Sequence, residues 1–350
     1  MGDWNTSGLS SEVTTTWQRT CVGLIVLGLG ACGAEAGPDQ PGVADPSALE
    51  AAELPESCDS CEPEGDPADA GIETCPKGPD AICHEFIATD NGRNVVNYVN
   101  EFDPSKNWTS AKVGTTANSP RTIEIVPNCT AKSRKAVLVS TNTGFVELDL
   151  ADGTLLRQQA GFVSVTSANR LPNKSTALGI VSNITNLDAS GCTVRTIPLP
   201  EGPDLRAINR NPHGGHYWFS KRENIFEIDK QGDVLWQANM GPGTKGYAVF
   251  WRKGGGAYAT TGDPATVLEI DAAGQVVSTV GGKANFPFLD FFSGFVRLPN
   301  GNFVVANWLG HITPQPDQPH LVELTPDNRE VWRWGDQTLA RQITSVYVFR

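Results

Sequence analysis

The chain has 350 residues, of which 39% are hydrophobic and 19% charged, and its formal net charge is −12 at pH 7. This length suits one large domain with additional segments. The segment 33–83 carries 13 acidic residues and one lysine, so the rest of the chain is close to neutral. A neutral body offers no basic surface for nucleic acid, and we expect no nucleic-acid partner.

Residues 1–31 are predicted to be a signal peptide. The apolar run CVGLIVLGLGA (21–31) is too short to cross a bilayer as a helix but has the length of a signal-peptide core. It leads into Leu29-Gly30-Ala31-Cys32, which resembles the lipobox of bacterial lipoproteins. The resemblance implies export, cleavage before Cys32 and lipidation of this cysteine, so that the membrane is a partner through the lipid anchor. Gly33 then implies the outer membrane, at its periplasmic face or at the cell surface.

The segment 32–57 is predicted to be an acidic, disordered tether, because it is rich in Pro, Ala and Glu and lacks the apolar residues needed to fold. A cysteine-rich segment follows over residues 58–83. Its cysteines are Cys58, Cys61, Cys75 and Cys83. Disulfides are favoured in an exported chain, whereas a zinc site of four thiolates is the alternative. We therefore expect two small disulfides, whose connectivity the spacing leaves open.

Residues 84–350 contain a phrase that occurs four times. Its copies are FVELDLADGTLLRQ (145–158), IFEIDKQGDVLWQ (225–237), VLEIDAAGQVVST (267–279) and LVELTPDNREVWRW (321–334). Each copy alternates with period two around a short turn, which predicts a β-hairpin. Two further strands precede each copy, giving units of about forty residues, as in β-propeller blades. The Glu that recurs in each phrase (Glu147, Glu227, Glu269, Glu323) is expected on a solvated strand face.

The sequence therefore predicts an all-β fold, a six-bladed β-propeller of four-stranded antiparallel blades over residues 84–350. Innermost strands are expected near 122–127, 164–171, 205–210, 245–252 and 291–298, and a sixth at ITSVYVF (343–349). The first blade has only three strands of its own, near 85–90, 95–101 and 108–113. The C-terminal strand is expected to complete it and to close the ring, which removes the exposed sheet edges. Seven blades is the alternative, if residues 60–83 contain strands.

Two further cysteines, Cys129 and Cys192, are predicted to form a disulfide. Cys129 lies in a turn between the first two strands of the second blade. Cys192 lies between the last two strands of the third blade. The up-and-down order of the strands puts both turns on the same face of neighbouring blades, so we expect the two residues to meet.

The phrases LPNGN, VVANW and PDNREVW are similar to those of exported propellers of the NHL-type and quinoprotein-like repeat proteins. The resemblance covers residues 84–350 and implies the propeller fold. Only Trp236 and Trp332 match the recurring tryptophan of the quinoprotein branch, so we expect no quinone cofactor.

Loops between strands 2 and 3, together with loops between blades, share one face of a propeller, where ligand sites open. The candidate ligand residues in these loops are Asp90, Asn91, Arg93, Lys221, Arg222, Asp263, His311 and His320. The cationic ones suit a small anionic ligand. Asp90 and Asp263 suit a calcium ion, the one cofactor that we consider. His213 and His216 flank two glycines without a neighbouring carboxylate, and no metal site is expected there.

These observations favour a lipid-anchored, exported propeller that acts as a binding module for a protein or a small ligand. The alternative is an exported enzyme of the arylsulfotransferase-like or lactonase-like type, which acts on an anionic or ester substrate at the central channel. It would use His311 together with Arg93 or Arg222. An enzyme needs such polar side chains to converge on one channel mouth.

Overall fold

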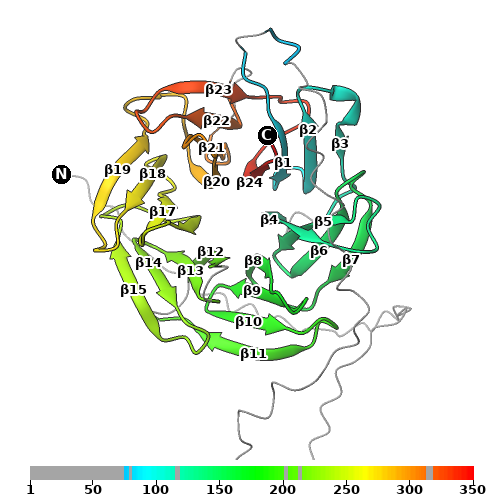
Figure 1. Ribbon diagram of the computed structural model, residues 1–350, viewed down its shortest axis with the longest axis vertical. Helices are drawn as coiled ribbons and strands as arrows, with labels where there is room; N and C mark the ends of the chain where they lie inside the picture. Colours follow the sequence, from blue (N-terminus) through cyan, green and yellow to red (C-terminus); the bar gives the residue numbers. More distant parts are fainter. Residues whose placement is uncertain (1–74, 79–80, 115–118, 201–203, 212–214, 313–317) are drawn as a thin grey trace, which may run out of the picture. The chain divides into compact units, whose positions relative to one another are not determined.

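The structure, a computed structural model, describes residues 75–78, 81–114, 119–200, 204–211, 215–312 and 318–350. These residues belong to one compact unit, residues 53–350. They form six four-stranded antiparallel sheets arranged in a ring (Figure 1), which confirms the predicted six-bladed propeller. Within this part of the chain, no helix has the length and apolarity needed to cross a membrane.

The strands follow the predicted up-and-down order in every blade, from the innermost strand outward. Blade 1 consists of β24 (Ile343–Val348), β1 (Glu85–Asp90), β2 (Val95–Asn100) and β3 (Trp108–Thr109), with the short 3-10 helix η2 (Pro104–Lys106) between β2 and β3. Blade 2 consists of β4 (Pro120–Pro127), β5 (Lys135–Thr141), β6 (Gly144–Asp149) and β7 (Leu155–Gln159). Blade 3 consists of β8 (Val165–Arg170), β9 (Thr176–Ile180), β10 (Asn183–Leu187) and β11 (Thr193–Pro198).

The second half of the ring repeats this order. Blade 4 consists of β12 (Leu205–Arg210), β13 (Tyr217–Lys221), β14 (Asn224–Ile228) and β15 (Val234–Asn239). Blade 5 consists of β16 (Val249–Trp251), β17 (Ala257–Thr260), β18 (Thr266–Ile270) and β19 (Val276–Gly281). Blade 6 consists of β20 (Phe292–Arg297), β21 (Phe303–Asn307), β22 (Leu321–Leu324) and β23 (Glu330–Trp334). The strand β16 is shorter than the predicted 245–252.

The last strand closes the ring, as predicted. Strand β24 pairs antiparallel with β1, with Ile87 opposite Tyr347. On its other side it lies against β20 of blade 6. Gly294 permits this approach, since a Cβ there would lie 2.8 Å from the Ser345 Cα atom. The first blade is therefore made of both ends of the propeller sequence (Figure 1).

The hydrophobic core is divided into six layers between neighbouring blades. Apolar side chains of blades 5 and 6 form one cluster, and blades 6 and 1 form another. The pairs 3 and 4, 4 and 5, 2 and 3, and 1 and 2 form the remaining four. Each blade thus buries both of its faces, which requires a closed ring because an open end would leave one layer exposed to water.

Two of the four recurring glutamates are buried, so the expectation of a solvated face was wrong for Glu147 and Glu323, which are 4% and 1% exposed. Glu227 and Glu269 are half-buried. A basic side chain contacts each glutamate: Arg170 for Glu147, His216 for Glu227, Arg252 for Glu269 and His84 for Glu323. The contacts of Glu147 and Glu323 join neighbouring blades. Burial of a carboxylate requires such partners, and the repeat supplies them from the region around the strand 1–2 turns.

The cysteines agree in part with the predicted disulfides. Cys75 and Cys83 form a disulfide with a Cα–Cα distance of 5.6 Å. This bond argues against a zinc site of four thiolates in the segment 58–83. Cys129 and Cys192 are both disulfide-bonded, and their pairing with each other stays a prediction. Cys32, Cys58 and Cys61 lie outside the described residues, as do the predicted signal peptide, the tether and His213.

Candidate functional site

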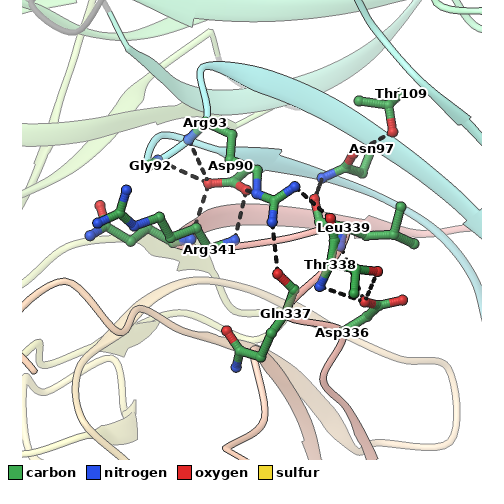
Figure 2. A network of polar contacts seen from close by, with 11 residues as sticks. Asp90, Gly92, Arg93, Asn97, Thr109, Asp336, Gln337, Thr338, Leu339 and Arg341 are labelled. Carbon is green, nitrogen blue, oxygen red and sulfur yellow. Dashed lines mark hydrogen bonds and ion pairs between the residues drawn. The ribbon is translucent and has the colours of Figure 1, made fainter. Parts of the chain in front are cut away.

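Asp90 and Arg93 hold the closure of the ring (Figure 2). Asp90 is 0% exposed. Its Oδ1 atom accepts hydrogen bonds from the backbone N–H groups of Gly92, Arg93 and Gln342 at 2.9, 3.1 and 3.0 Å, and its Oδ2 atom accepts one from Arg341 at 2.8 Å. Four N–H donors occupy the carboxylate, which leaves little room for a calcium ion.

Arg93 completes this contact from the other side. Its Nη2 atom donates to the backbone carbonyl of Gln337 at 2.7 Å, and its Nη1 atom donates to that of Thr338. Figure 2 shows both residues reaching from the β1–β2 turn to the segment that leads into β24. The geometry gives Asp90 and Arg93 a structural role, and their ligand role stays a prediction.

His320 lies in the interior rather than at a loop surface. It is 0% exposed, and its ring centroid is 5.9 Å from that of Trp334. Burial lowers the pKa of this imidazole, while the negative charge of Asp90 opposes the shift. A neutral, buried His320 does not suit direct contact with a ligand on the loop face.

Lys221 and Arg222 lie at the β13–β14 turn of blade 4. Lys221 is 2% exposed, and its Nζ atom donates to the carbonyl of Pro200. The Arg222 side chain is 74% exposed, and its Nε atom is 3.8 Å from Asp204. Only Arg222 of the two therefore presents its charge to solvent.

Asp263, His311 and Asn91 lie in one connected group. The His311 Nδ1 atom is 3.5 Å from Asp263 Oδ1, and Lys245 Nζ is 2.8 Å from Asp263 Oδ2. The hydrogen bond from Lys245 lowers the pKa of Asp263. The His311 ring packs edge-on against Trp308, whose Nε1 atom donates to Asn91 Oδ1 at 3.1 Å.

The predicted catalytic constellation is not assembled by direct contacts. Within the described residues, neither Arg93 nor Arg222 has a hydrogen bond or ion pair with His311 or Asp263. Asp263 is already paired with a lysine. No group of three or more His, Cys, Asp or Glu side chains in the described part of the chain is arranged to hold a metal ion.

The central channel is a better-formed site. The innermost strands of all six blades enclose a cavity of about 370 Å³. Polar side chains from blades 2, 3 and 4 are concentrated on one side of its wall, namely Glu124, Asn169, Asn209 and Arg210. Aromatic side chains from blades 5, 6 and 1 are concentrated on the other side, namely Tyr247, Phe250, Trp251, Phe295 and Tyr347. The wall also includes Trp218 of blade 4, isoleucines of blades 2 and 4, and Thr344 and Ser345 of blade 1.

The sheet register explains why these side chains meet. In blade 2, Glu124 lies opposite Leu138 on the second strand, which lies opposite Glu147 on the third. In blade 4, Asn209 lies opposite Trp218, which lies opposite Glu227. In blade 5, Phe250 has the equivalent position, because it lies opposite Tyr258, which lies opposite Glu269. One residue of each innermost strand therefore occupies an equivalent level of the channel wall, because the blades repeat the same pairing.

Glu124 is a channel residue with a raised pKa. Its Oε2 atom accepts a hydrogen bond from the Arg170 backbone N–H at 2.8 Å and one from Asn169 Nδ2 at 3.3 Å. Burial raises the pKa of this carboxyl, while these hydrogen bonds and the charges of Arg170 and Arg210 lower it. Within the described residues, the buried Asn169 Oδ1 atom has no hydrogen-bond partner. A raised carboxyl pKa in a cavity is typical of functional sites.

The aromatic half is partly open to the channel. Phe250 and Tyr347 are each 38% exposed, although both are large apolar side chains on inner strands. The Phe250 ring packs edge-on against Phe295, with centroids 4.8 Å apart. Exposed aromatic faces of this kind suit contact with a flat apolar group.

The substitution Glu124→Gln is expected to stabilise the protein more at about pH 7 than at about pH 4. The raised pKa means that the folded protein keeps this proton at pH values at which the unfolded chain has released it. Stability therefore falls as the pH rises from the ordinary carboxyl pKa through the raised one, and glutamine removes this penalty. Urea unfolding at both pH values measures the difference.

Glu330→Gln is the control, because Glu330 lies on the outer strand β23 and pairs with Arg333. A stability difference between Glu124→Gln and the wild type that is the same at both pH values would show that Glu124 has an ordinary pKa.

The comparisons with known proteins support the fold. No family model matches the sequence, and no curated protein matches it. Among solved structures, a protein of unknown function from Bacteroides caccae has a TM-score of 0.61 at 18% identity, covering 77% of this chain and 100% of its own. A streptogramin B lyase structure has a TM-score of 0.50 at 11% identity, covering 74% and 85%. At these identities the similarity shows that the chain is a β-propeller, and it shows no activity.

Proposed function

We propose that this protein is a small-ligand-binding propeller whose site is the central channel. The two-sided wall is the observation that supports this proposal. A volume of about 370 Å³ lies in the range of small-molecule sites. The predicted alternative, an arylsulfotransferase-like or lactonase-like enzyme, would need Arg93, Arg222 and His311 to act on one substrate, and these three side chains contact different partners.

The wall indicates the chemistry of the ligand. The Asn169 Oδ1 atom is an acceptor without a partner in the described residues, and the Glu124 carboxyl is a second acceptor, so the ligand needs donors such as hydroxyl or amide N–H groups on one edge. Phe250 and Tyr347 offer apolar surface to a flat face on its other side. A compact molecule with one polar edge and one apolar face would satisfy both halves.

The cellular location is part of the proposal and rests on the sequence alone. The signal peptide and Cys32 would anchor the protein to the outer membrane of a bacterium. The channel would then bind its ligand outside the cytoplasm.

We expect Asn169→Leu and Phe250→Ala each to weaken binding about tenfold, because each removes a contact of about 1.4 kcal/mol. The ligand is first identified by saturation-transfer NMR on a panel of monosaccharides, nucleosides and aromatic amides. Asn239→Leu is the matched control, since Asn239 is exposed at the end of β15. Equal affinity in all three variants and the wild type would place the ligand outside the channel.

A further inference from the structure

A second cavity lies between blades 2, 3 and 4. It has a volume of about 330 Å³ and is lined by residues of the β5–β6 and β9–β10 turns, by residues 162–164 and Asp204 between blades, and by the first residues of β4, β8 and β12. Arg121 and Arg206 both line it. None of the eight residues predicted as ligand contacts is part of its wall.

The cavity has more positive than negative charge. Arg121 uses its Nε atom to donate to Asn142 Oδ1 at 2.6 Å. Within the described residues, its two Nη atoms make no hydrogen bond or ion pair. Arg206 Nη2 is 3.2 Å from Asp204 Oδ1, but the same carboxylate also lies 3.8 Å from Arg222 Nε. One aspartate therefore faces two guanidinium groups, and Arg121 has no carboxylate partner in the described structure.

The wall also contains apolar side chains, which lie beside the polar Asn142, Thr143, Ser164 and Thr166. Phe162, Val163, Val181 and Leu205 line it, and Val163 is 77% exposed. Ser164 and Asp204 in the same wall have left-handed backbone conformations, with φ values of 60° and 117°. Such conformations are costly in residues other than glycine and often occur at binding sites. An exposed valine beside two arginines indicates a ligand with an apolar part and an anionic part.

The cavity also adjoins the channel. Arg121 and Arg206 each precede a residue of the channel wall, Thr122 and Ala207. Both arginines therefore lie at the beginning of innermost strands, on the face formed by the inter-blade loops.

We propose that this cavity binds the carboxylate of a small amphipathic acid, with Arg121 and Arg206 holding the carboxylate and Val163 covering its apolar body. A guanidinium group pairs well with a carboxylate through two parallel hydrogen bonds. The excess of about one positive charge suits a monoanion better than a phosphate. The site is separate from the proposed channel site and does not rest on it.

The test is isothermal titration calorimetry of the full protein with sodium hexanoate at low ionic strength. Arg121→Gln and Arg206→Gln are each expected to weaken binding about tenfold, and the double variant about a hundredfold. Arg195→Gln, on the exposed outer strand β11, is the matched control and should bind as the wild type does. Glu124→Gln should also leave hexanoate binding unchanged, which separates this site from the channel.

A series from propionate to hexanoate tests the apolar wall in the wild type, without any substitution. Affinity should rise about fourfold for each methylene that the cavity covers. Inorganic phosphate and hexylamine should bind at least tenfold more weakly than hexanoate. Equal binding of phosphate, the absence of a chain-length effect, or full affinity in the double variant would each overturn the proposal.

Discussion

Replacement of Asp90 by alanine is expected to lower the free energy of unfolding by about 3–5 kcal/mol. The carboxylate is 0% exposed and accepts four backbone N–H groups, two from its own turn and two from Arg341 and Gln342. Alanine would leave these donors buried without an acceptor, and it would remove the negative charge near Arg93, whose Nε atom lies 3.9 Å from Asp90. Urea unfolding at neutral pH measures the loss.

Two further variants test whether this loss of stability comes from the hydrogen bonds that close the ring. Asp327→Ala removes an exposed carboxylate that forms an ion pair with the exposed Arg329, so we expect no measurable change. Asp90→Asn keeps one acceptor oxygen but places an NH₂ group among N–H donors, so its loss should be intermediate. If Asp90→Ala unfolded at the same urea concentration as Asp327→Ala, the four hydrogen bonds would not stabilise the ring.

Most of the fold could be predicted because its signals are local. Period-two alternation and Gly or Asn turns indicated the outer hairpins. The repeat length of about forty residues then predicted where the inner strands lie. Closure of the ring could also be predicted, since the first blade lacked an innermost strand and the strand at 343–349 had no outer strands after it. The strand β16 is shorter than expected because the backbone N–H of Gly246 donates to the Arg222 carbonyl of the neighbouring blade at 2.9 Å.

The site was harder to predict because its contacts are long-range. Asp90 bonds to groups 251 and 252 positions away, so its loop position suggested a ligand residue rather than a closure residue. The recurring glutamates alternate with apolar residues, which suggested a solvated face, and their basic partners lie in other strands. The channel wall was missed, although one signal was present. Glu124, Asn169 and Asn209 are polar residues at equivalent positions of three innermost strands.

The largest loss of stability is expected from removal of residues 343–350, which contain the C-terminal strand β24. This strand provides the innermost position of blade 1 and one side chain that is 0% exposed, Ile343. Its loss would uncover the apolar layer between blades 6 and 1 and leave β1 as an unpaired edge in the middle of the ring. Each buried aliphatic side chain contributes about 1.5–3 kcal/mol, whereas the whole domain is stable by about 5–15 kcal/mol. We therefore expect the truncated chain to show no cooperative unfolding transition.

A synthetic peptide of residues 343–350 distinguishes loss of the closing strand from a general loss of folding. The peptide carries the pairing of Tyr347 with Ile87 and of Val346 with Ala88, so it should restore a cooperative transition when added to the truncated chain. A scrambled peptide of the same composition is the control, because it keeps the hydrophobicity but loses the alternation that sends Val346 into the core. Circular dichroism during thermal unfolding records both results. A truncated chain that melts cooperatively without any peptide would show that the ring holds together with one strand missing, and that closure by the C-terminal strand is not what stabilises blade 1.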